Sequence, residues 1–576
     1  MRRHGNGFLP QRWRTAKAST TVLAVVHNVT AATRLLDVLP IIARDQRLEI
    51  FFTCPGSSAF TSGTEEYLID RGIRPISWKE AIRRQFGLAI SASYGGDLHK
   101  IKAPLVVIPH GMGYNKYLKP EAGSRKPEAG SRKPEAGSRK PVFGLSTSWL
   151  MHKGAVVPTV IALSHTEQLE RLRVACPEAV PAAVVLGDPC VDRLTASRPL
   201  RETYRQAFGL TAGQRLVVVS STWGEHSLFG RWPELVRTLA HQLPLETHRL
   251  ALALHPNIPH GHSPWQVRMW LDECRRDGVL VLPEGDLWMP ALVAADVVLG
   301  DHGSVLFYSA VHGTPILLAS APTEAVAPDS PVGELLRLAP TIDPGDDLPR
   351  RIEQAILEHD PDLYAPVTTL ATARPGEFAA LFRHTVFDLA GLPDPGNHAR
   401  TTAAPIPRTG FPEPNATLVR ATLTPAPHQL DVTLDRYPAG SLTEPSRMPA
   451  ETHLVVDAQD PELGLLPMAD IVVHPSVAHA GQWIDATLRA LPGCQLAAAR
   501  DDQGWLFGST DGATVRLGAT AQGHLFASAV HTWLCSGRGL AELPGRLRLR
   551  LTGETVTVAG VAAAPGGPES RRPDMG

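Results

Sequence analysis

Two histidines in this chain follow short apolar runs, a position where an imidazole can carry out acid–base chemistry. His110 comes after residues 105–108, and His255 comes after residues 251–254, with Pro256 fixing the next turn. A histidine titrates near neutral pH, so its ring can accept a proton from an attacking hydroxyl group. Taken alone, each histidine is better explained as a surface-loop residue, but two of them after two predicted strands favour a shared cleft.

The second candidate is a phosphate-binding loop. Residues 301–304 (Asp-His-Gly-Ser) lie between a predicted strand over 296–300 and a predicted helix. Unpaired N–H groups and the dipole at the start of a helix favour a bound phosphate. Gly303 lets the backbone approach the ligand closely, and Ser304 adds a hydroxyl group. The alternative is that Asp301 or Ser304 only caps the helix.

Hydroxyl groups also follow a predicted strand over 216–219. Ser221 and Thr222 come after this strand, and Trp223 is next. Their hydroxyl and backbone donors are of the type that hold a diphosphate. Taken alone, these residues fit ordinary turn chemistry better. Their significance comes from their place in an ordered set of motifs.

The elements that would position these residues alternate along the chain. From residue 21 to about 320, short β-branched runs alternate with amphipathic stretches, the pattern of a parallel sheet with helices on both faces. We predict an α/β fold with two Rossmann-like halves, over 21–195 and 196–391. Residues 187–192 close the first half, either as an interdomain hinge that contacts substrate or as a tight turn. The candidate residues would then lie at the carboxyl ends of strands, where open α/β sheets bind ligands.

The remaining segments complete the predicted organisation. Residues 1–20 form a basic flexible tail. Three perfect Lys-Pro-Glu-Ala-Gly-Ser-Arg repeats make 119–141 a disordered insert, because a segment without large apolar residues cannot offset its ordering entropy. A charged arm near the site is the less favoured interpretation of this insert. Residues 392–416 are a Pro-rich linker, 417–561 a smaller β-rich or α+β accessory module, and 562–576 a disordered tail.

Composition excludes several classes of protein. Lys plus Arg (56) balances Asp plus Glu (57), so the chain lacks a global basic field and we predict no nucleic-acid partner. The six cysteines show no CxxC spacing, which argues against a disulfide framework and a metal site and favours a reducing compartment. P-loop, HExxH and GxSxG motifs are absent, as is a GxGxxG after the first predicted strand. These absences disfavour P-loop NTPases, conventional dehydrogenases and serine hydrolases.

In their order along the chain, the motifs resemble those of the CDP-glycerol glycerophosphotransferase family, whose members have the two-domain GT-B fold. The likeness covers about residues 85–320, and the matching segments are His110-Gly111, 187–192, 221–224, His255-Pro256, 301–308 and 313–315. The chain departs from the family pattern because His302-Gly303 replace Tyr-Ser, Gly224 replaces an arginine and Tyr308 replaces an aspartate. The 301–304 loop also resembles the glycine-bearing loop of UDP-N-acetylglucosamine 2-epimerases, which share the fold.

The resemblance implies a role for each candidate residue. His110 would be the general base. His255, Thr222 and Ser304 would hold the donor phosphates. Asp301 would orient the following histidine or the donor, and it joins His110 and His255 as a catalytic candidate. The further residues assigned to donor binding are Gly111, Ser221, Trp223, Pro256, His302 and Gly303.

The implied activity is the transfer of a glycerophosphate or glycosyl group from a nucleotide-diphosphate donor, such as CDP-glycerol, to a hydroxyl acceptor. The reaction would serve cell-envelope polymer synthesis and would need no metal and no cofactor besides the donor. A lipid-linked or polymeric acceptor would place the protein in the cytoplasm, peripheral to the inner face of the membrane. Two alternatives stay open: a UDP-sugar 2-epimerase or hydrolase, and a degenerate GT-B scaffold that binds a nucleotide or partner without catalysis.

Overall fold

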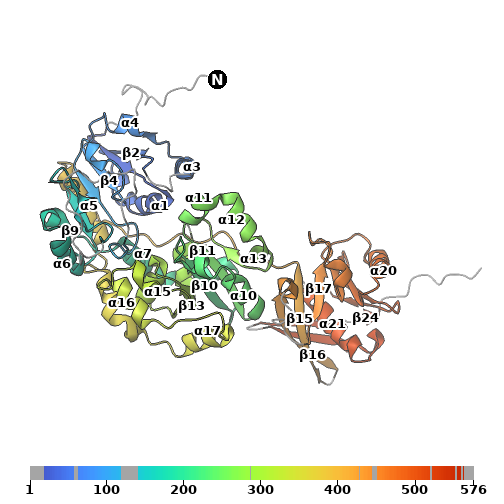
Figure 1. The fold of residues 1–576 in the computed structure, drawn as a ribbon. Helices are drawn as coiled ribbons and strands as arrows, with labels where there is room; N and C mark the ends of the chain where they lie inside the picture. The colour runs from blue at the N-terminus through green and yellow to red at the C-terminus, as the bar shows by residue number, and fades with distance from the viewer. Residues whose placement is uncertain are drawn as a thin grey trace, which may run out of the picture.

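The computed structural model describes residues 18–57, 63–117, 141–285, 287–426, 428–443, 451–518, 522–551, 554–559 and 562–563. Most of the predicted tails and nearly the whole predicted repeat insert lie outside the described residues, at 1–17, 118–140 and 564–576. The described chain forms three large sheets, of which two are parallel and one is mixed (Figure 1).

The first half is built on seven parallel strands in the order β3-β2-β1-β4-β5-β8-β9. Alternate residues of β1 face opposite sides, so that Val22 packs under α1 and Leu23 packs in the core on the other face. The strands are β1 (Thr20–Val25), β2 (Leu48–Cys54), β3 (Ile76–Ser77), β4 (Leu88–Ser91), β5 (Leu105–Val107), β8 (Val160–Leu163) and β9 (Ala183–Val185), and β6 (Met151–His152) pairs with β7 (Ala155–Val156). The helices are α1 (Val29–Val38), α2 (Pro40–Ala43), α3 (Thr64–Ile69), α4 (Trp78–Ala81), α5 (Thr147–Leu150) and α6 (Thr166–Ala175).

The second half repeats this plan with five parallel strands in the order β12-β11-β10-β13-β14. In the central strand, Val218 and Val219 belong to cores on opposite faces. The strands are β10 (Arg215–Ser221), β11 (His248–Leu254), β12 (Leu280–Val281), β13 (Val297–Gly300) and β14 (Ile316–Leu318). The helices are α7 (Pro189–Ser197), α8 (Arg201–Phe208), α9 (Leu228–Arg231), α10 (Leu235–Gln242), α11 (Asn257–His262), α12 (Pro264–Trp270), α13 (Asp272–Arg276), α14 (Trp288–Ala294), α15 (Ser304–His312), α16 (Pro331–Leu338), α17 (Leu348–Leu357) and α18 (Ala365–Thr368).

Both halves have the Rossmann strand order. Counted along each half, the strands run 3-2-1-4-5 from one edge, and the first half adds two further strands at the other edge. Helices cover both faces of each sheet, which is why the strand residues are apolar on both sides. The predicted fold class is confirmed: two Rossmann-like halves of the GT-B type, with a smaller C-terminal module.

Two segments cross between the halves. α19 (Phe378–Leu389) follows the second sheet in the chain, but its phenylalanines pack in the core of the first half. Conversely, α7 packs in the core of the second half. The carboxylate of Asp192 on α7 joins the two segments, because it accepts hydrogen bonds from the N–H groups of Gly376 (2.7 Å) and Phe378 (3.1 Å). Part of the range 196–391 therefore belongs to the first half by packing.

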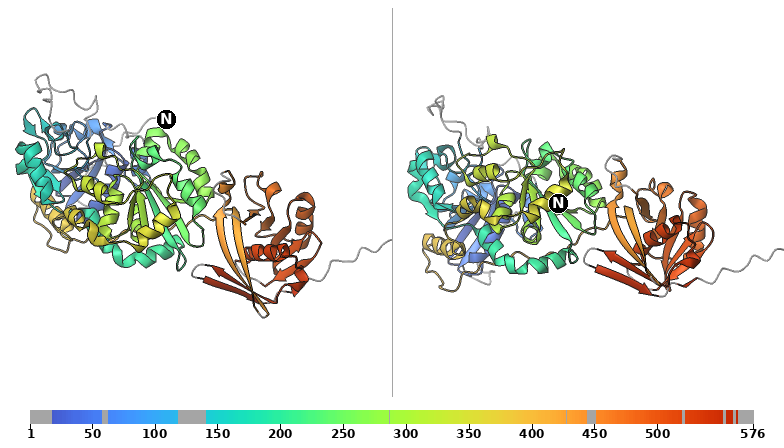
Figure 2. Two further views of the ribbon diagram at one scale, coloured as in Figure 1. Left: turned by 60° about the horizontal axis from the view of Figure 1, so that its bottom comes forward. Right: turned by 90° about the horizontal axis from the view of Figure 1, so that it is seen from below.

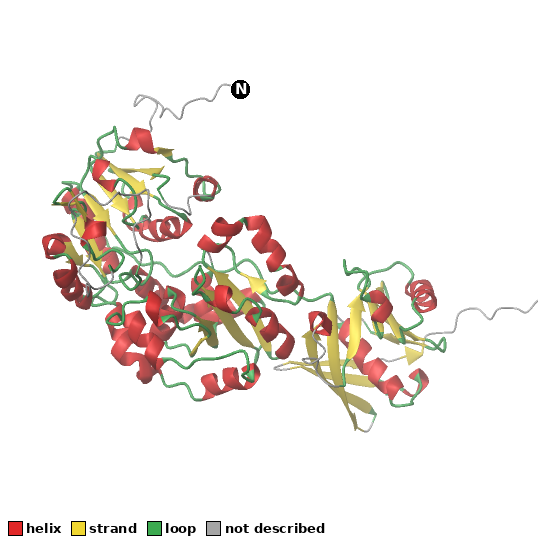
Figure 3. Ribbon diagram, in the orientation of Figure 1, coloured by secondary structure: helices red, strands yellow, loops and turns green. Residues whose placement is uncertain are grey.

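The C-terminal module is a mixed ten-stranded sheet with a helix on each face (Figure 3). Ala498 packs in the core under α21, whereas its neighbours Ala497 and Ala499 pack under α20. The strands are β15 (Ala416–Ala426), β16 (Gln429–Pro438), β17 (His453–Asp457), β18 (Ile471–His474), β19 (Leu496–Asp501), β20 (Gly504–Ser509), β21 (Thr514–Leu517), β22 (Arg546–Leu551), β23 (Glu554–Ala559) and β24 (Ala562–Ala563). The helices are α20 (Ala480–Ala490) and α21 (Phe526–Cys535).

The module docks on the second half, on the side away from the first half (Figure 2). The N–H of Leu245 donates to the carbonyl oxygen of Arg436 over 2.9 Å, and the Arg436 side chain pairs with Glu246 over 2.5 Å. A second ion pair joins Arg276 to Glu462 over 2.7 Å. The module therefore contacts the second half without lining the cleft between the halves.

Candidate active site between the two halves

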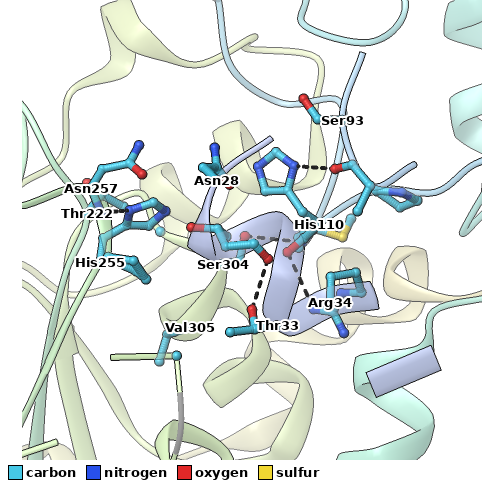
Figure 4. Close-up of a pocket in the computed structure, with 18 of the residues that line it drawn as sticks. Asn28, Thr33, Arg34, Ser93, His110, Thr222, His255, Asn257, Ser304 and Val305 are labelled. Atoms are coloured by element: carbon cyan, nitrogen blue, oxygen red, sulfur yellow. Dashed lines mark hydrogen bonds between the residues drawn. The ribbon is translucent and has the colours of Figure 1, made fainter. Parts of the chain in front are cut away.

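A cavity of about 330 Å³ lies between the two halves (Figure 4). Loops that follow β1, β4 and β5 line one side, and loops that follow β10, β11 and β13 line the other. Nine of the eleven predicted site residues line it: His110, Gly111, Ser221, Thr222, Trp223, His255, Pro256, Gly303 and Ser304. Asp301 and His302 do not. Figure 4 shows His110 and His255 on opposite sides of the cavity, with Ser304 between them.

His110 presents a hydrogen-bond acceptor to the cavity. Its Nδ1–H donates to the carbonyl oxygen of Ala92 over 3.0 Å, so in the neutral ring the proton is on Nδ1 and Nε2 carries the lone pair. The pKa of His110 is lowered to about 4, chiefly by burial and also by the positive charges of Arg34 and Lys116. The ring is therefore neutral at physiological pH and has the form of a base.

His255 presents the opposite polarity. Its Nδ1 accepts a hydrogen bond from the N–H of Asn257 over 3.1 Å, so the proton of the neutral ring is on Nε2. Burial lowers the pKa of His255 well below its ordinary value, and Lys116 and His110 add to the effect. This arrangement follows from the start of α11, because Asn257 is the first residue of that helix. His255 is therefore a neutral hydrogen-bond donor.

Asp301 holds two loops of the second half together. Its Oδ2 accepts hydrogen bonds from the N–H and the hydroxyl of Thr222 (2.9 and 2.8 Å) and from the N–H of Leu228 (2.8 Å), and its Oδ1 accepts from the N–H of Gly303 (3.0 Å). Burial raises the pKa of Asp301 although these donors oppose it. Within the described residues no hydrogen bond joins Asp301 to His302. The N–H and the hydroxyl of Thr222 both donate to Asp301, so neither is free to donate to a ligand.

Ser304 joins the two halves at the centre of the cavity. Its hydroxyl oxygen accepts a hydrogen bond from the N–H of Met112 over 3.1 Å, and Ser304 is the first residue of α15, which has no side-chain cap. A β-carbon at Gly111 would lie 2.7 Å from the Ser304 hydroxyl oxygen, and one at Gly303 would lie 2.8 Å from a methyl carbon of Thr222. The two glycines therefore allow the loops to approach each other.

The other predicted residues have structural contacts of their own. The hydroxyl of Ser221 donates to the carbonyl oxygen of Thr222 and accepts from the N–H of Phe229, each over 2.9 Å. The rings of Trp223 and His255 are 6.5 Å apart. His302 is buried outside the cavity, where burial and the nearby charge of Lys116 lower its pKa to about 2.

Lys116 is a cavity residue that sequence reasoning missed. It is half-buried, and within the described residues its side chain makes no hydrogen bond or ion pair. Burial lowers its pKa, and the charge of Asp301 opposes that shift. Lys116 pairs in an antiparallel bridge with Val326 of the second half, and the flanking Tyr117 N–H donates to the carbonyl oxygen of Ala325 over 3.1 Å. Within the first half, the carbonyl oxygen of Lys116 accepts a hydrogen bond from the N–H of Phe143 over 2.9 Å, so pairing on both sides fixes the lysine at the cavity.

Sequence reasoning also missed a buried polar network next to residues 187–192. Arg34 on α1 contacts the carbonyl oxygen of His110 and a carboxylate oxygen of Asp37, each over 3.5 Å. The Tyr308 hydroxyl donates to Asp188 over 2.9 Å, and Asp188 caps α7. No residue of the segment 187–192 lines the cavity. The segment leads into α7 and lies outside the cavity lining, and whether it acts as a hinge stays a prediction.

Two further properties concern the described residues. No group of three or more His, Cys, Asp or Glu side chains is arranged to hold a metal ion among them. In the same part of the chain, no helix combines the length and the apolar character that crossing a bilayer requires. Its six cysteines form no disulfide.

The sequence matches no protein-family model and no curated protein. Among solved structures, the chain is similar to the wall teichoic acid polymerase TagF, with 11% identity, a TM-score of 0.42 and coverage of 65% of this chain and 89% of that chain. MnaA of S. aureus in complex with UDP shows 11% identity, a TM-score of 0.38 and coverage of 64% and 97%. UDP-GlcNAc 2-epimerase from Neisseria meningitidis bound to UDP-GlcNAc shows 13% identity, a TM-score of 0.36 and coverage of 64% and 100%. No residue role and no reaction follows from likenesses at this level.

The two histidines are expected to differ in tautomer and to stay neutral at about pH 6. Two-bond ¹H–¹⁵N correlation spectra of protein with ¹⁵N-histidine, assigned with His110→Gln and His255→Gln, should show Nδ1–H for His110 and Nε2–H for His255. The folded pKa of His110, about 4, lies below the ordinary value of 6.5. Protonation of the unfolded chain therefore lowers the free energy of unfolding as the pH falls from 6.5 to about 4, whereas above pH 6.5 His110 costs no stability. An imidazolium signal for His110 at about pH 6, or one tautomer for both rings, would contradict the site geometry.

Proposed function

We propose that this chain is a transferase that moves a glycerophosphate or glycosyl group from a nucleotide-diphosphate donor to a hydroxyl acceptor. One observation carries the proposal: two neutral imidazoles of opposite hydrogen-bonding polarity face one cavity between two Rossmann-like halves. A lone-pair nitrogen suits the removal of a proton from an acceptor, and an N–H suits a phosphate oxygen. CDP-glycerol is the donor that the motif resemblance supports.

In the proposed reaction, the acceptor hydroxyl lies against Nε2 of His110. Its oxygen forms a bond to the phosphorus of a glycerophosphate or to the anomeric carbon of a sugar, and its proton passes to His110. The cavity supplies proximity by holding the donor and the acceptor between the two halves. Arg34 is a positioning residue, because its guanidinium contacts the carbonyl oxygen of His110.

The bond from the transferred group to the leaving phosphate oxygen breaks in the same step. Three features of the cavity would stabilise the negative charge left on that oxygen: the Nε2–H of His255, the ammonium of Lys116 and the N-terminus of α15 at Ser304. Lys116 would supply the cation that the chain lacks at Gly224. The proposed step uses only these groups and routes no charge through a metal ion.

The acceptor is proposed to be lipid-linked or polymeric and to belong to cell-envelope synthesis, as the motif resemblance implies. This places the protein in the cytoplasm, at the inner face of the membrane. Sedimentation with liposomes that contain anionic lipids, at low salt, tests the association. Recovery of all of the protein in the supernatant would exclude binding to such a surface.

The histidine variants are expected to separate catalysis from donor binding. Replacing His110 with alanine should lower turnover by about 10²-fold or more, because a positioned general base contributes that much, and should leave CDP or UDP affinity nearly unchanged. Replacing His255 with alanine should weaken nucleotide binding. Calorimetry with CDP and UDP side by side, together with turnover assays with and without EDTA, measures both effects. The exposed, unpaired His384→Ala is the matched control.

Each outcome of the histidine experiment has a distinct meaning. Full activity of the His110 variant would exclude the proposed base. Product formation from a UDP-sugar without an added acceptor would favour the epimerase or hydrolase. Tight nucleotide binding with no consumption of any donor would favour the degenerate scaffold.

Lys116 is expected to contact the donor phosphates and not the nucleoside. Lys116→Met should weaken the binding of CDP or UDP by about tenfold or more, which corresponds to a hydrogen bond with a charged group. Cytidine or uridine should bind the variant as they bind the wild type, and Lys116→Arg should recover part of the loss. Lys102→Met changes an exposed lysine and serves as the control. Equal losses for nucleotide and nucleoside would contradict a phosphate contact.

A further inference from the structure

A second cavity, of about 570 Å³, lies outside the cleft between the two halves. Three parts of the chain line it: α2 with the turn that follows it, α7 together with α19, and residues 395–402 of the predicted linker. We call it the linker cavity. Among the described residues, Asp37 alone lines both this cavity and the one in the cleft. A ligand in the linker cavity would therefore be distinct from a donor bound in the cleft.

Side chains of the folded core hold the linker in place as one wall of this cavity. Arg193 on α7 donates to the carbonyl oxygen of Thr402 over 3.2 Å. Arg383 on α19 pairs with Asp394 over 3.1 Å. The predicted linker is thus fastened at two points, and the wall that it forms has a defined place.

The opposite wall and the floor come from the first half. Ile42, Phe378 and Phe387 line the cavity and belong to the core of the first half, which fixes their positions. Pro40 and Ile41 add apolar surface that is exposed or half-buried. The linker cavity therefore has an apolar floor between two fixed walls.

The charges that line the linker cavity do not balance. They belong to four arginines and two aspartates: Arg44, Arg193, Arg383, Arg400, Asp37 and Asp45. Both carboxylates are paired, Asp37 with Arg193 and Asp45 with Arg47. Within the part of the chain that the structure describes, the side chains of Arg44 and Arg400 make no hydrogen bond or ion pair. Two positive charges are left without a partner, and no negative charge is.

This imbalance selects an anionic ligand. A guanidinium group binds a phosphate or a carboxylate through parallel hydrogen bonds. A phosphate monoester carries a charge of about −1.5 to −2 near pH 7, which matches two guanidinium groups, whereas a single carboxylate matches one. The volume of the cavity lies in the range of sites for organic ligands, and its apolar floor fits the body of such a compound.

We propose that the linker cavity is a binding site for a small organic phosphate ester. Arg44 and Arg400 hold the phosphate group, and the organic body lies against the apolar floor. The site goes beyond the proposed transferase function and does not depend on it, because it rests on a different cavity and on different charges.

Asp37 lies between the linker cavity and the candidate base. Its carboxylate contacts Arg193 on the side of the linker cavity, and it contacts Arg34, whose guanidinium contacts the carbonyl oxygen of His110. Because the two cavities share this carboxylate, the experiment includes a measurement at each of them.

The experiment uses the full chain and the double variant Arg44→Gln/Arg400→Gln, which removes two charges from exposed side chains. Ligand-observed NMR measures the binding of phenyl phosphate, glucose 6-phosphate and benzoate. We expect at least one phosphate ester to bind the wild type and to bind the double variant about fivefold or more weakly, because hydrogen bonds to charged groups are lost. Benzoate shares its ring with phenyl phosphate and is expected to bind more weakly. The affinity for CDP or UDP should change by less than about twofold, since the two sites are separate.

Two control variants locate the bound probe. Arg74→Gln/Arg83→Gln removes two exposed arginines far from both cavity linings and matches the change in net charge. Lys116→Met removes the cation of the cleft. Neither control should weaken the binding of the phosphate ester, and unfolding temperatures close to that of the wild type report an intact fold.

Each contrary outcome overturns a stated part of the proposal. If neither phosphate ester binds the folded wild type, the site is excluded. Equal weakening in the matched arginine control would reduce the binding to general charge attraction, and weakening in Lys116→Met alone would place the probe in the cleft. Benzoate that binds as tightly as phenyl phosphate would overturn the assignment to phosphate esters, and a larger loss of nucleotide affinity in the double variant would overturn the separation of the two sites. Failure of CDP and UDP to bind the wild type would refute the proposed donor instead, and the binding of the phosphate esters would still decide the linker cavity.

Discussion

The candidate site depends on the backbone pairing that joins the two halves across the cleft. The N–H of Ala327 donates to the carbonyl oxygen of Asn115 over 2.7 Å, and the antiparallel bridge at Lys116 and Val326 continues this pairing. Neither half contains a complete site. The first half carries His110 and Lys116, and the second half carries His255 and the N-terminus of α15. Because the pairing fixes the backbone on both sides of Lys116, it sets where the cavity receives its positive charge.

Burial determines the charge state of the site. It is the main cause that lowers the pKa of His110 to about 4 and the pKa of His255 well below its ordinary value, so both rings are neutral near pH 7. The backbone then decides the role of each ring, because a carbonyl at Nδ1 leaves an acceptor and an N–H at Nδ1 leaves a donor. Lys116 is left as an unpaired charge, since Asp301 is engaged by four hydrogen bonds. The cavity therefore combines one unpaired ammonium with two neutral imidazoles.

The sequence was sufficient to predict features that depend on local pattern. Runs such as residues 216–219 and 251–254 indicated parallel strands, and a parallel sheet brings the loops after its strands to one edge, so the cavity gathers most of the predicted residues. Features that depend on distant pairing were not predictable. Lys116 is held at the cavity by backbone pairing with the distant residues Val326 and Phe143, and α19 returns to the first half because of its packing.

The departures from the family motifs have a structural explanation in this chain. Gly224 has a φ of +85°, a left-handed conformation that an arginine rarely adopts, so this turn disfavours the expected cation at that position. Lys116, whose side chain is unpaired, lies in the cavity on the side of the first half, opposite the loop that precedes Gly224. Tyr308 stands where the family pattern has an aspartate, so a hydroxyl donor replaces a carboxylate acceptor. The hydroxyl of Tyr308 donates to Asp188, which caps α7. Each departure therefore follows from the local backbone or hydrogen bonding of this chain: a left-handed turn at Gly224 and an acceptor for the hydroxyl of Tyr308.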